Sequence, residues 1–596
     1  MVEALHAHGS LAAIELCQQG MATANLASRE VPLAPSAQSL IVSAPWQARE
    51  MDLSDIRSLR ASHRASALLA KRAGYDIVYV YAGHDLSLAQ HFLLPRYNQR
   101  RDEYGGSLEN RVRLLRELIE DTKEAVGDSC AVAVRLAVDE LLGPEGMAVA
   151  GEAPEIIAML AELPDLWDVN ISDWSNDSQT ARFAEEGYQD GFTAFVKGLT
   201  SKPVVGVGRY TSPDHMAALV AKGALDFIGA ARPSIADPFL PKKIEEGRIE
   251  DIRECIGCNI CVSGDMTFTP IRCTQNPTMG EEWRKGWHPE HIPPRASDDA
   301  ILIVGGGPAG LECARALGQR GYAVTLAEAS EALGGRVRFE SRLPGMASYQ
   351  RVADHRIAAF HNLSNVETYL ASELSAEDAI AFGAPHIVLA TGAHWRRDGV
   401  GRRQRFPLSI SDAGPAIHTP DDIMAGHEPK AGPILVYDDD GYIMAGLIAE
   451  KLAREGRDVT IMTPDAMVSP WTVNTLEQHA IQRRLLELGV TIAAGRRLLS
   501  LESGVRHACV YSGAEAELAA AAVVLVTSRI SNDELWRELQ TRADAGDAPW
   551  RSLTRIGDAL APATVAHAVY AGHRFAREFD APPAEGAPYK RERVSV

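Results

Sequence analysis

The chain has 596 residues, of which 46% are hydrophobic and 23% are charged, an ordinary globular composition that excludes disorder, collagen and coiled coil. Its 79 acidic against 60 basic residues give a net charge of −19, which argues against a nucleic-acid partner because phosphate binding needs a basic face. The sequence contains no run of about 18 apolar residues, so no membrane partner is expected. This length predicts three or four domains.

The cysteine content points to a metal site in a reducing compartment. Eight cysteines are too few for a disulfide scaffold, and four of them fall between Cys255 and Cys273. Residues 1–10 are polar and lack the apolar core of a secretory signal, which predicts a cytoplasmic protein whose chain begins with the end of a helix.

The first part of the chain alternates short β-rich runs with amphipathic stretches such as residues 107–126. The β-rich runs are residues 11–16, 76–83, 131–138, 166–172, 203–209 and 224–232. Strands that alternate with helices imply a parallel sheet, either open or closed into a barrel. A closed (β/α)8 barrel needs eight strands, so two strands are expected to precede Met1.

A cysteine motif follows this region. Cys255, Cys258 and Cys261 are separated by two residues each, and Cys273 follows after eleven more. Three thiolates at this spacing with a distant fourth favour a [4Fe–4S] cluster, whereas zinc sites normally use paired C-x-x-C knuckles. Zinc or free thiols remain alternatives. The other four cysteines, Cys17, Cys130, Cys313 and Cys509, are scattered in apolar contexts and are interpreted as core residues.

A dinucleotide-binding pattern begins at residue 300. Gly305, Gly307 and Gly310 follow an apolar strand and open a helix, and Glu328 lies at the end of the next strand. The glycines let the backbone approach a pyrophosphate, and the carboxylate accepts a ribose hydroxyl. Further residues extend the pattern towards an FAD-type lobe: Gly335, Arg336 and Asp558. An ordinary glycine-rich turn is the alternative.

A third strand–turn–helix at residues 433–453 departs from this pattern. Asp438, Asp439 and Asp440 stand where glycines would cradle a second pyrophosphate. Carboxylates there would repel NADH, which predicts a degenerate Rossmann-like lobe that is kept for packing.

Active groups of a barrel are expected at the carboxyl ends of its strands. Tyr81, His84 and Asp173 occupy such positions and could form a hydrogen-bonded relay, although each alone has a structural explanation. Glu15 and Arg135 lie within strands of the same region. The glycine-rich ends of the last two strands predict a phosphate site that uses backbone amides plus Arg209 or Arg232.

The order of these motifs resembles the iron–sulfur flavoproteins related to trimethylamine dehydrogenase, a group that includes dimethylamine and histamine dehydrogenases and N-methyl amino acid demethylases. Their barrel is that of the old yellow enzyme superfamily. The similar segments are YVYAGH (79–84), NQRRDEYGGSLENR (98–111), GVGRYTSP (206–213), ARPSIADPF (231–239) and CIGCNIC (255–261). The resemblance implies FMN in the barrel, one [4Fe–4S] cluster, and FAD or ADP in the second region.

The resemblance also assigns roles and boundaries. It implies that Tyr81, His84 and Asp173 form a catalytic triad and that Glu15 and Arg135 contact the flavin ring. It also implies that the flavin phosphate is bound by Gly208, Arg209 and Arg232. It implies an α/β chain with an N-terminally incomplete TIM barrel, a cluster segment and two Rossmann-like domains. Their residues are 1–245 for the barrel, 246–297 for the cluster, 298–430 with 545–596 for the FAD or ADP domain, and 431–544 for the degenerate domain.

The implied activity is oxidation of a secondary or tertiary N-methylated amine, with electrons passed through the cluster to an electron-transfer flavoprotein, in a homodimer. Two alternatives stay open. One is an NAD(P)H-dependent enoate or dienoyl-CoA reductase, although Leu86 replaces the proton-donating tyrosine of such enzymes. The other is a non-catalytic electron-transfer module. Trp174 is the candidate aromatic for the amine pocket, with loop packing as its alternative.

Overall fold

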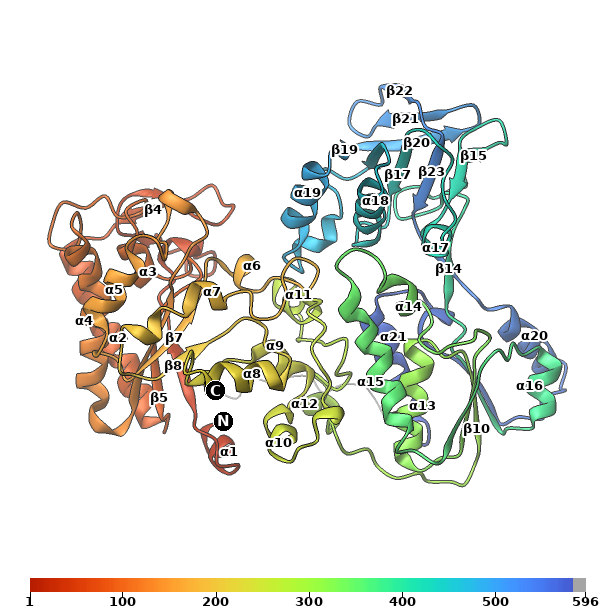
Figure 1. Cartoon of the computed structure of the whole chain (residues 1–596), viewed down its shortest axis with the longest axis horizontal. Helices are drawn as coiled ribbons and strands as arrows, with labels where there is room; N and C mark the ends of the chain where they lie inside the picture. Colours follow the sequence, from red (N-terminus) through yellow and green to blue (C-terminus); the bar gives the residue numbers. More distant parts are fainter. Residues whose placement is uncertain (582–596) are drawn as a thin grey trace. The chain divides into compact units, whose positions relative to one another are not determined.

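The computed structural model describes residues 1–581 and divides the chain into two compact units (Figure 1). The first unit comprises Met1–Ser178 and Glu185–Ala231, and the second comprises Gln179–Ala184 and the chain from Arg232 onward. Residues 582–596, the end of the predicted 545–596 segment, lie outside the described residues. Within residues 1–581, no helix is both long enough and apolar enough to cross a membrane.

The first unit is built on a six-stranded parallel sheet whose strand order follows the chain. Its strands are β1 (Ala13–Leu16), β5 (Ile77–Ala82), β6 (Ala131–Ala137), β7 (Leu166–Asn170), β8 (Val204–Gly206) and β9 (Phe227–Ile228). The predicted strands are therefore confirmed, each within its predicted segment. Helices α2 (Leu53–Arg72), α4 (Leu108–Val126), α5 (Ala153–Leu160) and α8 (Pro213–Ala221) connect them.

Helix α4 shows how the sequence produces these connections. Ser107 caps its first turn by accepting a hydrogen bond from the Asn110 amide, and Gly127 ends it with a φ of 58°. Its apolar residues recur at three- and four-residue spacing and are buried, so one face of the helix packs while the other stays polar.

The second unit contains a five-stranded parallel sheet in the order β12-β11-β10-β13-β25. The strands are β10 (Ile301–Val304), β11 (Val324–Ala327), β12 (Val366–Tyr369), β13 (His386–Leu389) and β25 (Ser552–Arg555). Helices α13 (Pro308–Arg320), α15 (Arg351–Phe360) and α21 (Val565–Glu578) cover one face, and α16 (Ala376–Phe382) and α20 (Glu534–Asp544) cover the other (Figure 1). Strand β25 returns to this sheet after the chain has completed the next lobe.

That next lobe holds a second five-stranded parallel sheet in the order β16-β23-β17-β18-β19. Its strands are β16 (Ala416–His418), β17 (Ile434–Asp438), β18 (Val459–Thr463), β19 (Thr491–Ala494) and β23 (Ala522–Val526), with α18 (Met444–Arg454) and α19 (Gln478–Glu487) packed on it. Along the chain, a cysteine-containing segment with α11 (Ile260–Met266) and α12 (Glu282–Lys285) follows β9 and precedes β10. The predicted α/β architecture is confirmed.

Candidate functional site

The register of the barrel strands aligns two of the predicted site residues with a third titratable residue. Tyr81 on β5 pairs with Arg135 on β6, and Arg135 pairs with Asp168 on β7. Aligned residues of neighbouring strands project to the same face of a sheet, so these side chains form one row. The carboxyl ends of the same strands carry the remaining candidates.

Tyr81 and His84 contact each other directly. The Tyr81 hydroxyl hydrogen-bonds Nδ1 of His84, and both residues are buried. His84 and Asp85 both have a φ of 58°, in the left-handed region. Gln90 accepts a hydrogen bond from the Asp85 amide at 2.8 Å, and the Tyr97 hydroxyl donates to the Asp85 carboxylate at 2.7 Å. These contacts hold the unusual turn that presents His84.

The carboxylate beside His84 belongs to Asp177, not to Asp173. Asp177 Oδ2 lies 3.2 Å from His84 Nε2, whereas Asp173 accepts hydrogen bonds from the Asn176 amide and the Ser175 hydroxyl and caps helix α6 (Trp174–Asp177). Only the backbone of Asp173 approaches His84, through an isolated β-bridge. The structure thus brings Tyr81 and His84 together and directs the Asp173 side chain to a structural contact.

Charge and burial set the ionisation of this cluster. Burial raises the pKa of Asp177, but the hydrogen bond and charge of His84, together with the Gln189 amide, outweigh burial and leave its pKa below the usual value. Burial also raises the pKa of Tyr81, and Arg135 opposes that rise. Asp177 is therefore a carboxylate at neutral pH, and Tyr81 holds its proton strongly unless a neighbour assists its release.

Arg135 and Glu15 form the donor and acceptor set expected at a flavin ring. Nη1 of Arg135 lies 3.1 Å from Glu15 Oε1, and its Nε lies 3.9 Å from Asp168 Oδ2. Burial raises the pKa of Asp168 to about 6. Among residues 1–581, the buried Nε of Arg135 and Oδ1 of Asp168 have no hydrogen-bond partner. Unpaired buried polar atoms are costly, and a polar heterocycle such as the FMN ring would satisfy them.

The predicted phosphate residues fall in both units. Gly208 and Arg209, which follow β8, have φ values of 155° and 54°, so this turn uses backbone that favours glycine and can point amides outward. Arg232 belongs to the second unit, where its Nη1 donates at 2.8 Å to the backbone oxygen of Gln179 and to Oδ1 of Asn259.

The four motif cysteines lie in a loop of unusual backbone. Gly257 and Asn259 have φ values of 61° and 55°, the Gly257 amide donates to Cys255 Sγ at 3.3 Å, and Cys258 Sγ lies 3.3 Å from the Thr274 hydroxyl. Burial raises the pKa of Cys258, Cys261 and Cys273 to about 12. In residues 1–581, no three His, Cys, Asp or Glu side chains converge closely enough for a single metal ion. A cluster whose thiolates bind different irons does not require such convergence.

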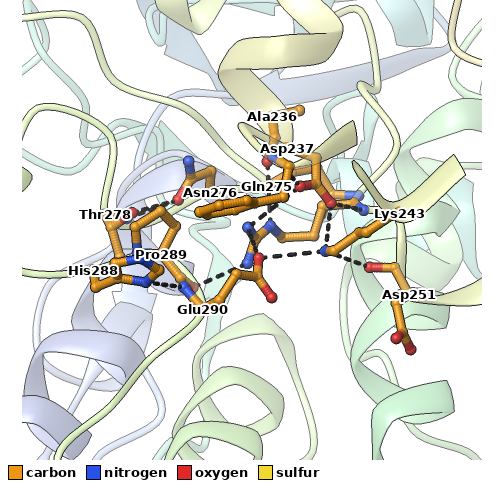
Figure 2. Close-up of polar contacts among 12 residues, drawn as sticks. Ala236, Asp237, Lys243, Asp251, Gln275, Asn276, Thr278, His288, Pro289 and Glu290 are labelled. Carbon is orange, nitrogen blue, oxygen red and sulfur yellow. Dashed lines mark hydrogen bonds and ion pairs between the residues drawn. The ribbon is translucent and has the colours of Figure 1, made fainter. Parts of the chain in front are cut away.

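Buried ion pairs fix the chain on the amino-terminal side of these cysteines (Figure 2). Lys243 Nζ donates to Asp237 Oδ2 at 2.7 Å and to the Asp251 backbone oxygen at 2.9 Å. Arg253 donates through its backbone amide to Asp237 and through Nη2 to Glu290. Asp237, Lys243 and Arg253 are all buried, so the segment entering Cys255 is anchored by a paired charge cluster.

The residues predicted for the nucleotide lobe meet in one cavity of about 270 Å³. The residues of the pattern that line it are Gly305, Gly307, Glu328, Gly335, Arg336 and Asp558. Gly310 lies in α13, where a Cβ would come within 1.9 Å of the Gly305 backbone oxygen, so this close approach requires glycine. Asp558 pairs with Arg336 at 3.2 Å and with Arg529 at 2.9 Å.

The backbone donors of the acidic turn after β17 are bonded within the protein, since the amides of Asp439 and Asp440 donate to the Val526 backbone oxygen at 2.9 and 3.1 Å. The Asp438 carboxyl accepts hydrogen bonds from the Gly441 amide at 2.8 Å and the Ser469 amide at 3.1 Å. Asp439 accepts from the amides of Arg403 and Gln404. Both aspartates are fully buried. The amides of Asp439, Asp440 and Gly441 are therefore bonded within the protein, whereas an open phosphate-binding turn would offer such amides to a ligand.

Sequence reasoning missed Asp177 and Asn170. Asn170 ends β7, is completely buried, and places Nδ2 2.5 Å from His84 Nε2. An asparagine at the carboxyl end of a barrel strand was the available signal, since such positions face the active site of barrel enzymes. Asp177 gave no comparable signal, because it lies beyond the strand in a short helix.

Comparisons with known proteins agree with this arrangement. Residues 1–251 match the NADH:flavin oxidoreductase / NADH oxidase family, residues 303–372 an NAD(P)-binding Rossmann-like domain, and residues 418–505 an OYE-like second alpha/beta domain. Dimethylamine dehydrogenase of Hyphomicrobium sp. (strain x) is 39% identical, with 99% of this chain and 85% of that protein covered.

Two solved structures are also similar over nearly the whole chain. Histamine dehydrogenase from Rhizobium sp. 4-9 superposes with a TM-score of 0.97 at 50% identity and covers 100% of this chain and 87% of its own. The 6-hydroxypseudooxynicotine amine oxidase from Pseudomonas geniculata N1 has a TM-score of 0.94 at 48% identity, with 97% and 86% covered.

Proposed function

Because this chain belongs to the family of dimethylamine dehydrogenase, we propose that it is an amine dehydrogenase for a secondary or tertiary N-methylated amine. The resemblance drawn from the sequence motifs is confirmed, and the chain is an amine-acting oxidoreductase. In the proposed reaction, a C–H bond on a carbon next to the amine nitrogen breaks, with the loss of two electrons and a proton. Water then hydrolyses the resulting iminium to an aldehyde and a smaller amine.

The proposal uses the residues of the barrel to hold FMN. Glu15 and Arg135 would contact its ring, and Gly208 and Arg209 its phosphate; the unpaired buried atoms of Arg135 and Asp168 support this fit. When bound, FMN supplies the two-electron acceptor for the amine, and a [4Fe–4S] cluster held by Cys255, Cys258, Cys261 and Cys273 supplies a one-electron relay.

The contacts of Tyr81, His84 and Asp177 are the observation that carries the proposal. An ammonium ion has no free lone pair, so the substrate must release a proton before its nitrogen can assist C–H oxidation. The Tyr81 oxygen is the atom that would receive or steer this proton, His84 Nδ1 is hydrogen-bonded to it, and Asp177 stabilises positive charge on His84. This arrangement is a proton relay within a single compact unit.

Trp174 supports the choice of a cationic substrate. It lies three residues before Asp177 on α6, so the two side chains share one face of this helical turn. An indole face attracts an alkylammonium ion through a cation–π interaction. We therefore propose that Trp174 forms part of the amine pocket.

The second unit contains the residues proposed to hold the cluster and a second nucleotide. The nucleotide cavity would hold ADP or FAD through its glycines and Glu328, and an electron-transfer flavoprotein would accept electrons from the cluster. Rapid anaerobic mixing tests the proposal as a whole. N-methylated amines should bleach the flavin absorbance of the purified holoenzyme, and Tyr81→Phe should slow that step by roughly ten- to a thousandfold. Absence of bleaching by any N-methylated amine would refute the function.

The name of the matched family, NADH:flavin oxidoreductase, makes an NADH-dependent reductase the competing function. The acidic turn opposes that alternative, because the amides of Asp439, Asp440 and Gly441 already donate within the protein. Mixing with NADH under the same conditions separates the two functions, since fast bleaching by NADH would favour the reductase.

A further inference from the structure

A buried carboxylate, that of Glu140, lies just after β6, at the same end of the barrel sheet as the proton relay. Arg96 binds both of its oxygens, through Nη1 to Oε2 and through Nη2 at 2.7 Å to Oε1, and the Met147 amide donates to Oε2 at 2.8 Å. A buried carboxylate that is bound bidentately by an arginine and by a backbone amide has its charge compensated and its position fixed. The proposed amine reaction gives this group no role.

Gln90 joins this carboxylate to the turn that carries His84. It lies in α3 (Leu88–Leu93) and is completely buried. Its Nε2 donates to Glu140 Oε1 at 3.4 Å, and its Oε1 accepts from the Asp85 amide at 2.8 Å. These partners fix the orientation of the side-chain amide, because a backbone N–H only donates and a carboxylate held by an arginine accepts. The side chain is therefore a bridge from Glu140 to the residue that follows His84.

Arg96 makes a second connection to the same turn. Its Nη2 lies 3.5 Å from Asp85 Oδ1, and the Tyr97 hydroxyl donates to the other oxygen of that carboxylate at 2.7 Å. Because Glu140 holds the guanidinium of Arg96, this ion pair also depends on Glu140. The turn is thus held through the amide of Asp85 and through its side chain.

The backbone of Glu140 holds another turn, the one between β7 and α6. Its carbonyl oxygen accepts a hydrogen bond of 2.9 Å from the Ser172 hydroxyl, and Ser172 Oγ accepts one of 3.1 Å from the Asn176 side-chain amide. The hydroxyl has already donated its hydrogen, so only the amide nitrogen can bond to it. Asn176 lies on α6 next to Asp177, and this chain of hydrogen bonds ends beside the carboxylate that faces His84.

Left-handed backbone at three strand ends shows why such an anchor is needed. Asp85, Leu141 and Ser172, which follow β5, β6 and β7, have φ values of 58°, 56° and 53°. Residues other than glycine keep this conformation only where surrounding contacts impose it. Glu140 precedes Leu141, bonds to Ser172 directly and reaches Asp85 through Gln90. One residue therefore supports all three strained turns.

We propose that Glu140 is a positioning residue that fixes His84 and Asp177 relative to each other by anchoring the two turns that carry them. The contact of 3.2 Å between His84 Nε2 and Asp177 Oδ2 is the geometry that this anchor preserves. The inference rests on the proposed role of that pair in the amine reaction. Glu140 acts through its hydrogen-bonded neighbours and needs no contact with the amine.

Hydrogen–deuterium exchange of the purified holoenzyme tests the two links separately. Gln90→Leu keeps the size of the side chain, removes the bridge and should speed exchange in a peptide covering residues 83–92. Ser172→Ala removes the hydroxyl and should speed exchange in a peptide covering residues 171–178. Each variant should leave the other peptide at the wild-type rate, because each breaks one link only.

Glu140→Gln should speed exchange in both peptides. Whichever carboxylate oxygen is replaced, the new amide nitrogen faces an N–H of Arg96, so the side chain loses its hold and the backbone oxygen that binds Ser172 loses its support. We expect exchange to be about tenfold faster or more, the effect of one buried donor left unpaired. If this variant failed to fold, the double variant Gln90→Leu/Ser172→Ala breaks both links and takes its place.

Flavin reduction by saturating amine tests the consequence for the relay. The rate is measured per bound flavin, so a loss of folded protein does not enter it. Glu140→Gln should slow this step about ten- to a hundredfold, the range for a small misplacement of reacting groups. Adding Gln90→Leu to Glu140→Gln should slow it no further, because the bridge is already broken.

Asp121→Asn is the matched control. It removes another carboxylate bound by two nitrogens of one arginine, Arg60, at 2.7 and 2.9 Å, in an ion pair that joins α2 to α4. This variant should lower the melting temperature and leave both peptides and the rate of flavin reduction unchanged.

The inference is overturned if Glu140→Gln leaves both peptides at the wild-type rate of exchange, or if it slows flavin reduction no more than Asp121→Asn does. The exchange measurement is independent of the amine reaction. If no amine reduced the flavin, the proposed function would fail, while exchange would still decide whether Glu140 anchors the two turns.

Discussion

Asp177 Oδ2 lies 3.2 Å from His84 Nε2 and joins helix α6 to the turn that follows β5. Gln189 fixes the other carboxylate oxygen with a hydrogen bond of 2.8 Å from its amide. The carboxylate is therefore held on both sides, at a position where it can stabilise a protonated imidazole.

Replacing Asp177 should damage the amine reaction, whereas replacing Asp173 should not. Asp177→Asn removes the charge that stabilises His84 and should slow flavin reduction roughly ten- to a thousandfold, with an altered pH profile. Stopped-flow reduction by saturating amine measures this step. Asp173→Asn is the matched control, since asparagine caps helices about as well as aspartate. Equal damage by both substitutions would contradict the assignment.

The two aspartates also show where sequence reasoning reaches its limit. The strand pattern placed Tyr81 and His84 at a strand end, and the backbone of Asp173 does reach His84. The direction of its side chain depends on competition with two local donors at the start of α6, which strand periodicity does not describe. Asp177 and Asn170 join the site only through tertiary contacts of β7 and α6 with the turn after β5.

The same contrast holds for the second unit. Glycine spacing and the acidic residue after β11 predicted the residues that now line one cavity, because a dinucleotide turn needs those residue types at fixed positions. The acidic turn was interpreted as a source of repulsion. The structure adds that its carboxyl groups bond to amides of Gly441, Ser469, Arg403 and Gln404, contacts that distant sequence positions conceal.

The cysteine motif predicts iron in the purified protein. Protein isolated without oxygen should be brown and contain about four iron and four sulfide per chain by chemical analysis. Cys258→Ser should lose iron and block transfer to an external acceptor, while amine still bleaches the flavin. Cys509→Ser changes a cysteine in β21 (Val505–Cys509) and should keep the iron content. Stoichiometric zinc without iron would refute the cluster.

The acidic turn predicts that NADH is not a reductant for this enzyme. Because the amides of Asp439, Asp440 and Gly441 already donate within the protein, they are not free to bind a pyrophosphate. Excess NADH should therefore leave the flavin oxidised on the timescale of amine reduction, as followed by its visible absorbance. NADH oxidation at a rate comparable with amine oxidation would show that nucleotide binds elsewhere or displaces these contacts.

Asp438 also predicts how stability depends on pH. Burial, opposed by the amides of Gly441 and Ser469, raises the pKa of its carboxyl to about 7, against about 3.9 in an unfolded chain. Between these values the folded protein binds the proton and the unfolded chain does not, so this group stabilises the fold below about pH 4 and loses that contribution as pH rises through about 7.

Asp438→Asn should remove this pH dependence, because the amide stays neutral throughout. Asparagine has a single acceptor oxygen, so the variant leaves one backbone amide unpaired and should melt below the wild type at pH 5. The deficit should shrink as the pH approaches 8, where the wild type holds a buried charge, and thermal unfolding at several pH values measures it. Asp128→Asn, at an exposed aspartate, should show no such trend. A deficit that stays constant from pH 5 to pH 8 would mean that the carboxyl of Asp438 does not change its protonation state in this range.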